Sequence, residues 1–162
     1  MSHSLVAANR SWEGSLASPA RILVIEDNPG DVFLLRHALE AVGEHFELKV
    51  LADGEEALKF VQEHRLGLPP PDPCVIVLDL HLPKYDGMVV LRAIKRAPAL
   101  EHIDVLVLSG LVSDKEMQEL LTLGIQSHSR KPSTLAEFQA LAEEIMALCK
   151  KGLERALEPK NV

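Results

Sequence analysis

The sequence predicts a doubly wound α/β domain, with a five-stranded parallel sheet covered by helices on both faces. Five short apolar runs alternate with five amphipathic segments from residue 21 onward, and this alternation is typical of repeated βαβ units. Near-continuous apolar runs are characteristic of parallel strands that are buried on both faces. Right-handed crossovers then distribute the helices over the two faces of the sheet.

The first half of the chain contains two strand–helix pairs. The expected strands are residues 22–25 and 46–51; the first helix covers about 30–42, and the second begins after Asp53-Gly54. A stiff proline-rich loop at 66–73 leads to the third strand, because proline disfavours both helix and strand pairing. The apolar faces of the two helices are formed by Val32, Leu35, Ala38, Leu39, Ala57, Leu58 and Val61.

The second half contains three further pairs. Strands are expected at 75–78 and 105–108, with a weaker one at 125–128, and helices from near Gly87, over about 114–123 and over about 134–157. Ser113 and Glu116 have the spacing of a capping box before the fourth helix. The apolar faces of the third and fifth helices are formed by Val90, Leu91, Ile94, Leu135, Phe138, Leu141, Ala142, Ile145 and Leu148.

Three segments make up the expected organisation. Residues 1–20 lack sustained periodicity and are interpreted as a flexible N-terminal arm, residues 21–150 form the folded domain, and 151–162 extend the last helix into a tail. One helix follows the fifth strand, which leaves no room for an attached output domain. We therefore expect signals from this domain to pass through non-covalent partners.

Composition argues against several classes of function. The chain has 162 residues, 47% hydrophobic and 25% charged, with a net charge of -7. These values fit one globular domain and argue against a nucleic-acid partner, which would need a basic surface. No apolar run approaches the roughly 18 residues of a membrane span, and the N-terminus lacks the features of a signal peptide. We expect a cytoplasmic protein with no membrane partner.

The two cysteines, Cys74 and Cys149, lie in an expected strand and an expected helix. They show neither a disulfide framework nor the paired spacing of a zinc site. We interpret them as small, buried or half-buried apolar residues, which fits a reducing cytoplasm.

Acidic residues end two of the expected strands. Glu26 and Asp27 follow the first strand, and Asp79 follows the third. Because the carboxyl ends of parallel strands emerge at the same edge of a sheet, the three carboxylates should converge there. Like charges at that separation repel, so a hard cation such as Mg²⁺ is the natural partner. Asp27 and Asp79 would bind Mg²⁺ directly, and Glu26 through a coordinated water.

Two further residues belong to the same expected edge. Ser109 follows the fourth strand, and Lys131-Pro132 follow the fifth. Asp79 is the candidate nucleophile, because carboxylates form covalent aspartyl phosphates. Lys131 would pair with Asp79 at rest and with phosphoryl oxygens afterwards, and Ser109 would offer its hydroxyl to the same oxygens.

In this order the motifs resemble the receiver domain of two-component response regulators, over about residues 21–150. They are Glu26-Asp27-Asn28, Asp79-Leu-His-Leu-Pro83 with Asp86-Gly87, Ser109-Gly110 and Lys131-Pro132. Each motif alone is common, but their order at successive strand ends is specific. The resemblance implies a flavodoxin-like (βα)5 fold with strand order 2-1-3-4-5.

The resemblance also implies the roles of particular residues. Asp79 would be the phosphoacceptor, Mg²⁺ would be bound by Asp27, Asp79 and the backbone carbonyl of His81, and Ser109 would be the switch hydroxyl. The chain would then be a single-domain response regulator, phosphorylated by a histidine kinase or a phosphotransfer protein. It would not be a conventional turnover enzyme.

Partners follow from the same resemblance. The run 28–31, the proline-rich loop and the run 82–87 are similar to stand-alone regulators encoded beside phytochrome-type histidine kinases. The face formed by the fourth helix, the fifth strand and the fifth helix is where the family commonly dimerises. We expect a homodimer through that face, with Lys115, Glu119 and Arg130 supplying charged contacts. Leu153, Ala156 and Leu157 continue the apolar stripe of the last helix and would contact a partner or a second copy.

Two histidines stand out against the family pattern: His128 departs from it, and His81 is an additional feature beside the acceptor. His128 occupies the position where the family usually has Tyr or Phe, three residues before the lysine. It is interpreted either as a switch residue that responds to pH or as a solvent-edge side chain with no switching role. His81 flanks the acceptor, where it would affect water access and hence the lifetime of the acyl phosphate.

Three alternatives are weighed against this interpretation. In the first, the acids only cap helices, as Asp27 or Asn28 would do for the first helix, but capping does not explain Asp79, Ser109 and Lys131 together. An aspartyl-phosphate phosphohydrolase would place an Asp-x-Asp nucleophile after the first strand, and that motif is missing. A phosphorylation-independent pseudo-receiver that acts as an interaction module is the third.

Overall fold

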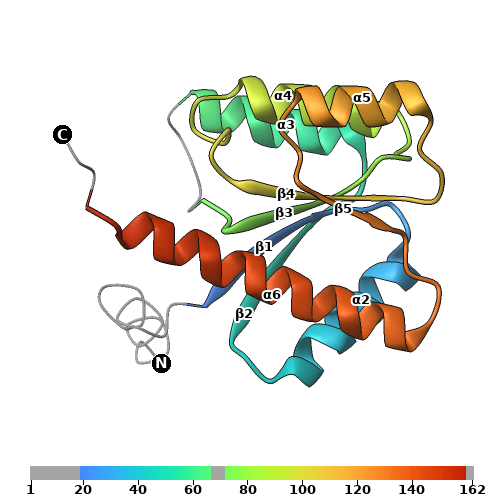
Figure 1. The fold of residues 1–162 in the computed structure, drawn as a ribbon, viewed down its shortest axis with the longest axis vertical. Helices are drawn as coiled ribbons and strands as arrows, with labels where there is room; N and C mark the ends of the chain where they lie inside the picture. The colour runs from blue at the N-terminus through green and yellow to red at the C-terminus, as the bar shows by residue number, and fades with distance from the viewer. Residues whose placement is uncertain (1–18, 67–71, 160–162) are drawn as a thin grey trace, which may run out of the picture.

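Five parallel strands form the sheet of the computed structural model, which describes residues 19–66 and 72–159 (Figure 1). Their order is β2-β1-β3-β4-β5, which confirms the predicted fold class and strand order. The strands are β1 (Ala20–Ile25), β2 (Phe46–Leu51), β3 (Val75–Asp79), β4 (Asp104–Ser109) and β5 (Ser127–Arg130).

Helices cover both faces of this sheet. α2 and α6 lie on one face, and α3, α4 and α5 lie on the other (Figure 1). No helix within residues 19–66 or 72–159 has the length and apolar character needed to cross a membrane. The helices are α2 (Pro29–Val42), α3 (Gly54–Arg65), α4 (Gly87–Arg96), α5 (Asp114–Thr122) and α6 (Leu135–Leu157).

Alternate residues of the central strands supply two apolar cores. In β1, Leu23 and Ile25 face the core beneath α3, α4 and α5, whereas Ile22 and Val24 face the core beneath α2 and α6. All five residues of β3 are buried, as expected for a strand at the centre of a doubly covered sheet. This double burial holds the carboxyl ends of β1 and β3 rigidly beside each other.

Polar side chains begin each helix, so the chain turns sharply after each strand. The side chain of Asn28 accepts hydrogen bonds from the backbone N–H groups of Gly30 and Asp31 at the start of α2. Asn28, and not Asp27, is therefore the cap. The predicted capping box of Ser113 and Glu116 is present at α5. The other caps are Asp53, Asp86 and Thr134.

The fifth strand begins two residues later than predicted. Ile125 is buried, but its N–H donates to the carbonyl of Leu120, and Gly124 has φ +75°. These bonds form a Schellman motif that ends α5, and its apolar contact uses Ile125. The apolar character that favoured a strand at 125–128 therefore belongs to the helix end, and the polar segment Ser127–Arg130 pairs with β4.

The interpretation of the cysteines as unpaired residues was wrong. Cys149 is fully buried and Cys74 is half-buried, as expected, but the two form a disulfide with a Cα–Cα distance of 4.9 Å. They are 75 positions apart in the sequence. Their pairing depends on how α6 lies against the start of β3, which no local spacing motif reveals.

Parts of three expected segments lie outside the described residues. The N-terminal arm predicted at 1–20 has its last two positions described, and Ala20 already begins β1. Residues 67–71 of the proline-rich loop and 160–162 of the tail also lie outside.

Candidate functional site

Three carboxylates meet at the carboxyl edge of the sheet. β1 and β3 are hydrogen-bonded neighbours, with Ile25 opposite Leu78, so the residues that follow these positions emerge side by side. One carboxylate oxygen from each of Glu26, Asp27 and Asp79 lies within 4.8 Å of the others. Glu26 and Asp79 are buried, with 6% and 1% of their surface exposed, while Asp27 is exposed. The structure therefore brings together the predicted acids.

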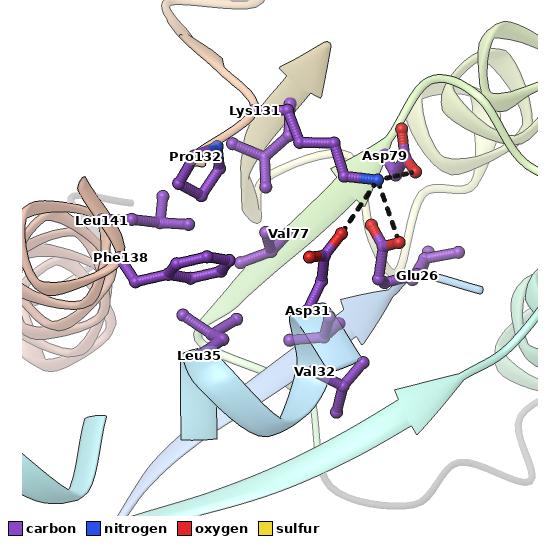
Figure 2. A pocket seen from close by; sticks show the side chains of 13 residues that line it. Glu26, Asp31, Val32, Leu35, Val77, Asp79, Lys131, Pro132, Phe138 and Leu141 are labelled. Carbon is purple, nitrogen blue, oxygen red and sulfur yellow. Dashed lines mark hydrogen bonds and ion pairs between the residues drawn. The ribbon is translucent and has the colours of Figure 1, made fainter. Parts of the chain in front are cut away.

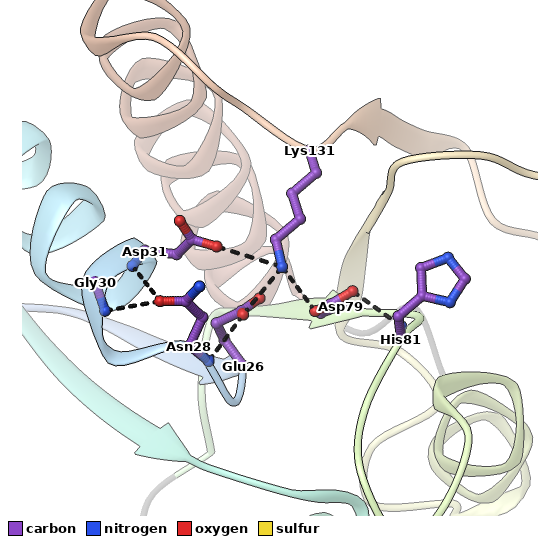
Figure 3. Close-up of polar contacts among 7 residues, drawn as sticks. All are labelled: Glu26, Asn28, Gly30, Asp31, Asp79, His81 and Lys131. Carbon is purple, nitrogen blue, oxygen red and sulfur yellow. Dashed lines mark hydrogen bonds and ion pairs between the residues drawn. The ribbon is translucent and has the colours of Figure 1, made fainter.

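Lys131 reaches into this cluster from the loop after β5. Its Nζ lies 3.0 Å from Oδ2 of Asp79, 3.1 Å from Oε1 of Glu26 and 3.3 Å from Oδ2 of Asp31 (Figure 3). The backbone N–H of Lys131 donates to the carbonyl of Ser109 at 3.0 Å, which fixes the start of this loop beside β4. One ammonium group thus bridges side chains from the ends of β1 and β3 and from α2.

Backbone donors hold the two buried carboxylates in place. The N–H of His81 donates to Oδ1 of Asp79 at 2.9 Å, and the N–H of Asn28 donates to Oε1 of Glu26 at 3.1 Å. Each carboxylate therefore has one bond from its own loop and one from Lys131 (Figure 3). Such fixed donors orient the acids before any ligand arrives.

The electrostatics of the cluster favour an added cation. Burial, together with the neighbouring charge of Asp79, raises the pKa of Glu26 to about 7, even though Asn28 and Lys131 bond to it. Burial alone would lower the pKa of Lys131, but its hydrogen bonds with Asp79 and Glu26 outweigh that effect and raise the pKa above its ordinary value. Lys131 therefore stays charged, yet one ammonium does not balance the carboxylates around it.

The donor set fits a hard divalent cation. Carboxylate oxygens from Glu26, Asp27 and Asp79 are the ligands that Mg²⁺ prefers, and the exposure of Asp27 leaves the site open to the coordinated waters that Mg²⁺ usually keeps. The pKa of Glu26 is raised first by burial and then by the neighbouring charge of Asp79, and a cation beside the two carboxylates would offset both effects.

The remaining predicted site residues lie around the same edge. Ser109 is buried at the end of β4, and its hydroxyl donates to the carbonyl of Leu111 at 2.8 Å. His128 is exposed on β5. His81 is also exposed, and its backbone N–H donates a hydrogen bond to the carboxylate of Asp79. The roles of Ser109, His128 and the His81 carbonyl stay predictions.

An apolar wall underlies the polar cluster. A small pocket extends from Glu26, Asp79 and Lys131 into the space between β3, α2 and α6 (Figure 2). This wall limits water beneath the carboxylates, and the lower local polarity strengthens their interaction with Lys131. Its apolar members include Leu35, Val77, Pro132, Phe138 and Leu141.

Sequence reasoning missed Asp31 as a member of the site. It lies in the first turn of α2, and its carboxylate approaches Lys131 because Asn28 caps the helix and sets the direction of that turn. The spacing of four residues from Asp27 gave no signal for this contact, because Asp27 precedes the cap and lies outside the helix.

Comparisons with known proteins agree with this geometry. A family model described as the response regulator receiver domain matches residues 22–143. The probable methanogenesis regulatory protein FilR2 of Methanothrix harundinacea is 35% identical over 127 residues, which are 78% of this chain and 81% of the relative. The response regulator Rcp1 of Synechocystis sp. is 32% identical over 127 residues, 78% of this chain and 86% of the relative.

Solved structures give the same result. The phosphorylated cyanobacterial phytochrome response regulator RcpA superposes with a TM-score of 0.72 at 28% identity, covering 82% of this chain and 95% of RcpA. The Mn²⁺-bound form of Rcp1 superposes with a TM-score of 0.68 at 30% identity, covering 80% of this chain and 93% of Rcp1.

Proposed function

The chain belongs to the response regulator receiver family, and from this premise we propose that it is a single-domain response regulator whose Asp79 accepts a phosphoryl group. The observation that carries the proposal is the buried carboxylate of Asp79, held between the N–H of His81 and the ammonium of Lys131. Its function is signalling: phosphorylation alters the surface that binds partners or a second copy.

The transfer step uses groups that the chain already positions. A carboxylate oxygen of Asp79 attacks the phosphorus of a phosphohistidine; an O–P bond forms, the P–N bond breaks, and the departing imidazole takes up a proton. Lys131, 3.0 Å from Asp79, stabilises negative charge on the phosphoryl oxygens as they arrive. Fixed donors of this kind are the main source of catalysis in phosphoryl transfer.

A divalent cation completes the proposed site. Asp27, Asp79 and the backbone carbonyl of His81 would hold Mg²⁺ directly, and Glu26 would hold it through a water. When bound, the cation would neutralise charge on the carboxylates and on the transferred group. The Mn²⁺-bound form of the relative Rcp1 supports a divalent metal in this family.

Ser109 and His128 are the proposed switch residues. In this structure the Ser109 hydroxyl donates to Leu111, so a move toward a phosphoryl group on Asp79 would release the loop that follows β4. His128 lies exposed on the neighbouring strand β5, where a change of rotamer would alter the same outer face. Asp79 and that face would thereby be coupled.

Partners are proposed from the relatives and from this face. RcpA is a phytochrome response regulator, which supports a phytochrome-type histidine kinase as the phosphoryl donor in the cytoplasm. The proposed homodimer would use α5, β5 and α6, where Lys115 and Arg130 are exposed. Glu119, the third residue expected there, bonds to Arg92 of α4 within the chain, so it is less available to a second copy.

Incubation with acetyl phosphate tests the proposal. Wild-type protein should gain the mass of one phosphoryl group in the presence of Mg²⁺ and none in EDTA. The Asp79→Asn variant should gain none under either condition, with folding checked by circular dichroism. A folded wild-type protein that gains no phosphoryl group in a rapid-quench time course would instead support the pseudo-receiver alternative.

A further inference from the structure

The two cysteines form a second chemical site at the opposite end of β3 from Asp79. Cys74 immediately precedes β3, whereas Asp79 ends it, so the two ends are about 16 Å apart for a strand rising 3.3 Å per residue. The Cα atoms of Cys74 and Cys149 are 4.9 Å apart, which is within the usual range for a disulfide. None of the proposed phosphorylation residues takes part.

The two sulfur atoms differ in their access to solvent. Cys149 is fully buried in α6, but Cys74 is half-buried and lines a groove between the end of α6 and the loops before β3 and β4. Pro73, His102 and Leu153 line the same groove. A small reagent can therefore approach Cys74 from solvent, and Cys149 is reached through Cys74.

The reduced state is also accommodated by this geometry. The carbonyl oxygen of Arg21 lies 3.2 Å from Sγ of Cys74, so a Cys74 thiol can donate a hydrogen bond that the disulfide cannot. An ion pair between Arg155 and Asp104 joins α6 to the start of β4 independently of sulfur chemistry. The cysteines therefore stay close to each other whether or not they are bonded.

We propose that Cys74 and Cys149 form a redox-reversible modification site that takes small disulfides such as oxidised glutathione. The Cys74 thiolate attacks one sulfur of the small disulfide, a mixed disulfide forms, and one small thiolate leaves. The Cys149 thiolate then attacks Sγ of Cys74 and expels the second small thiolate. The protein loses two electrons and two protons, and the small disulfide is reduced to two thiols.

Oxidation at this site acts on the last helix. The disulfide covalently joins α6 to the segment before β3, and cross-linking of distant positions stabilises the fold mainly by restricting the unfolded chain. In a reducing compartment such a bond is transient and redox-sensing rather than permanent. The site would therefore adjust how firmly the C-terminal turns of α6, which include the exposed Leu153 and Leu157, are held on the domain.

The test follows the cysteines of the full chain in mixtures of reduced and oxidised glutathione. Samples are quenched with acid, denatured, alkylated with N-ethylmaleimide and weighed by mass spectrometry. The wild type should pass from two alkylated cysteines to none as the mixture becomes more oxidising, and dithiothreitol should restore both. Oxidation should raise the melting temperature by on the order of 10 °C.

Two single variants distinguish attack through Cys74 from simple proximity. Cys149→Ala should accumulate a glutathione adduct at Cys74, because no second thiol resolves it. Cys74→Ala should gain no adduct, because Cys149 is buried. Thermal unfolding confirms that each variant is folded. The Asp79→Asn variant should form the disulfide as the wild type does, which would show that the cysteine site works independently of phosphorylation.

Three outcomes would overturn the proposal. In the first, the wild type keeps both thiols in fully oxidised glutathione. In the second, it stops at a mixed disulfide and forms no intramolecular bond. A bond that dithiothreitol cannot reduce in the folded protein would show a permanent disulfide instead of a reversible one.

Discussion

The Nζ atom of Lys131 lies 3.0 Å from Oδ2 of Asp79, although 52 positions separate the two residues in the sequence. The contact joins the loop after β5 to the end of β3, across the intervening strand β4. Lys131 also contacts Glu26 and Asp31, so a charge that moves onto Asp79 alters every bond of this ammonium group. A phosphoryl group on Asp79 would therefore be detected directly by the loop that begins α6.

Lys131→Met tests the contribution of the ammonium group. We expect phosphorylation by acetyl phosphate to slow by about 100-fold, because the variant loses a fixed donor to the phosphoryl oxygens. Affinity for Mg²⁺ should not fall, since Lys131 supplies no oxygen ligand and its charge repels a cation. Intact mass against time measures the first quantity, and titration calorimetry measures the second.

Lys151→Met is the matched control for that substitution, because Lys151 is exposed on α6. It should phosphorylate at the wild-type rate. If the folded Lys131→Met variant is phosphorylated as fast as the wild type, Lys131 does not contribute to the transfer step.

Glu26 should make the stability of the metal-free protein depend on pH. Its pKa is about 7 in the folded protein against an ordinary value of 4.5, so between these values the folded state binds more protons than the unfolded state. The free energy of unfolding should therefore fall as the pH rises from 4.5 to 7, with no further contribution from Glu26 above that range. Urea unfolding in EDTA at several pH values measures this free energy of unfolding.

The Glu26→Gln variant isolates this effect, because glutamine does not titrate. The difference in unfolding free energy between wild type and variant should change across pH 4.5–7 and be constant outside it. Carboxylates with lowered pKa values, such as Glu116 and Glu137, act at lower pH and are common to both proteins. Parallel curves over the whole range would contradict the raised pKa of Glu26.

Gly87 lies where a side chain has no room. A Cβ atom at this position would lie 2.5 Å from Cα of Leu80 and 2.7 Å from the carbonyl oxygen of Asp79. Gly87→Ala should destabilise the fold by about 1–3 kcal/mol through this backbone overlap. The substitution should also slow phosphorylation, because the added methyl group displaces Asp79. A Cβ at Gly110 meets nothing within 4 Å, so Gly110→Ala should change stability by less than about 0.5 kcal/mol. Equal urea midpoints for the two variants would refute the steric argument.

Much of the fold and of the acidic cluster could be predicted because both depend on local patterns. Apolar runs located four of the five strands, and acids directly after two of them had to meet at one sheet edge once the strands were parallel. β5 was misplaced because the buried Ile125 belongs to a helix-ending motif, and a single apolar residue does not distinguish a strand from a cap.

The features that escaped prediction depend on how one helix is placed against its neighbours. Asp31 reaches Lys131 only through the direction that Asn28 gives to α2. Cys149 meets Cys74 only because α6 lies along the sheet as far as the start of β3. Such contacts are set by the packing of whole elements, and neither has a spacing motif in the chain.

His81 should control how long the phosphoryl group persists. It is exposed two residues beyond the acceptor, and its N–H holds Oδ1 of Asp79. His81→Ala keeps that backbone bond but removes the side chain, so water should reach the acyl phosphate more easily and hydrolyse it severalfold faster. His81→Gln retains most of the bulk and should decay at close to the wild-type rate. The measurement is loss of phosphoprotein by intact mass after the donor is removed; equal decay in all three proteins would show that the side chain does not limit water access.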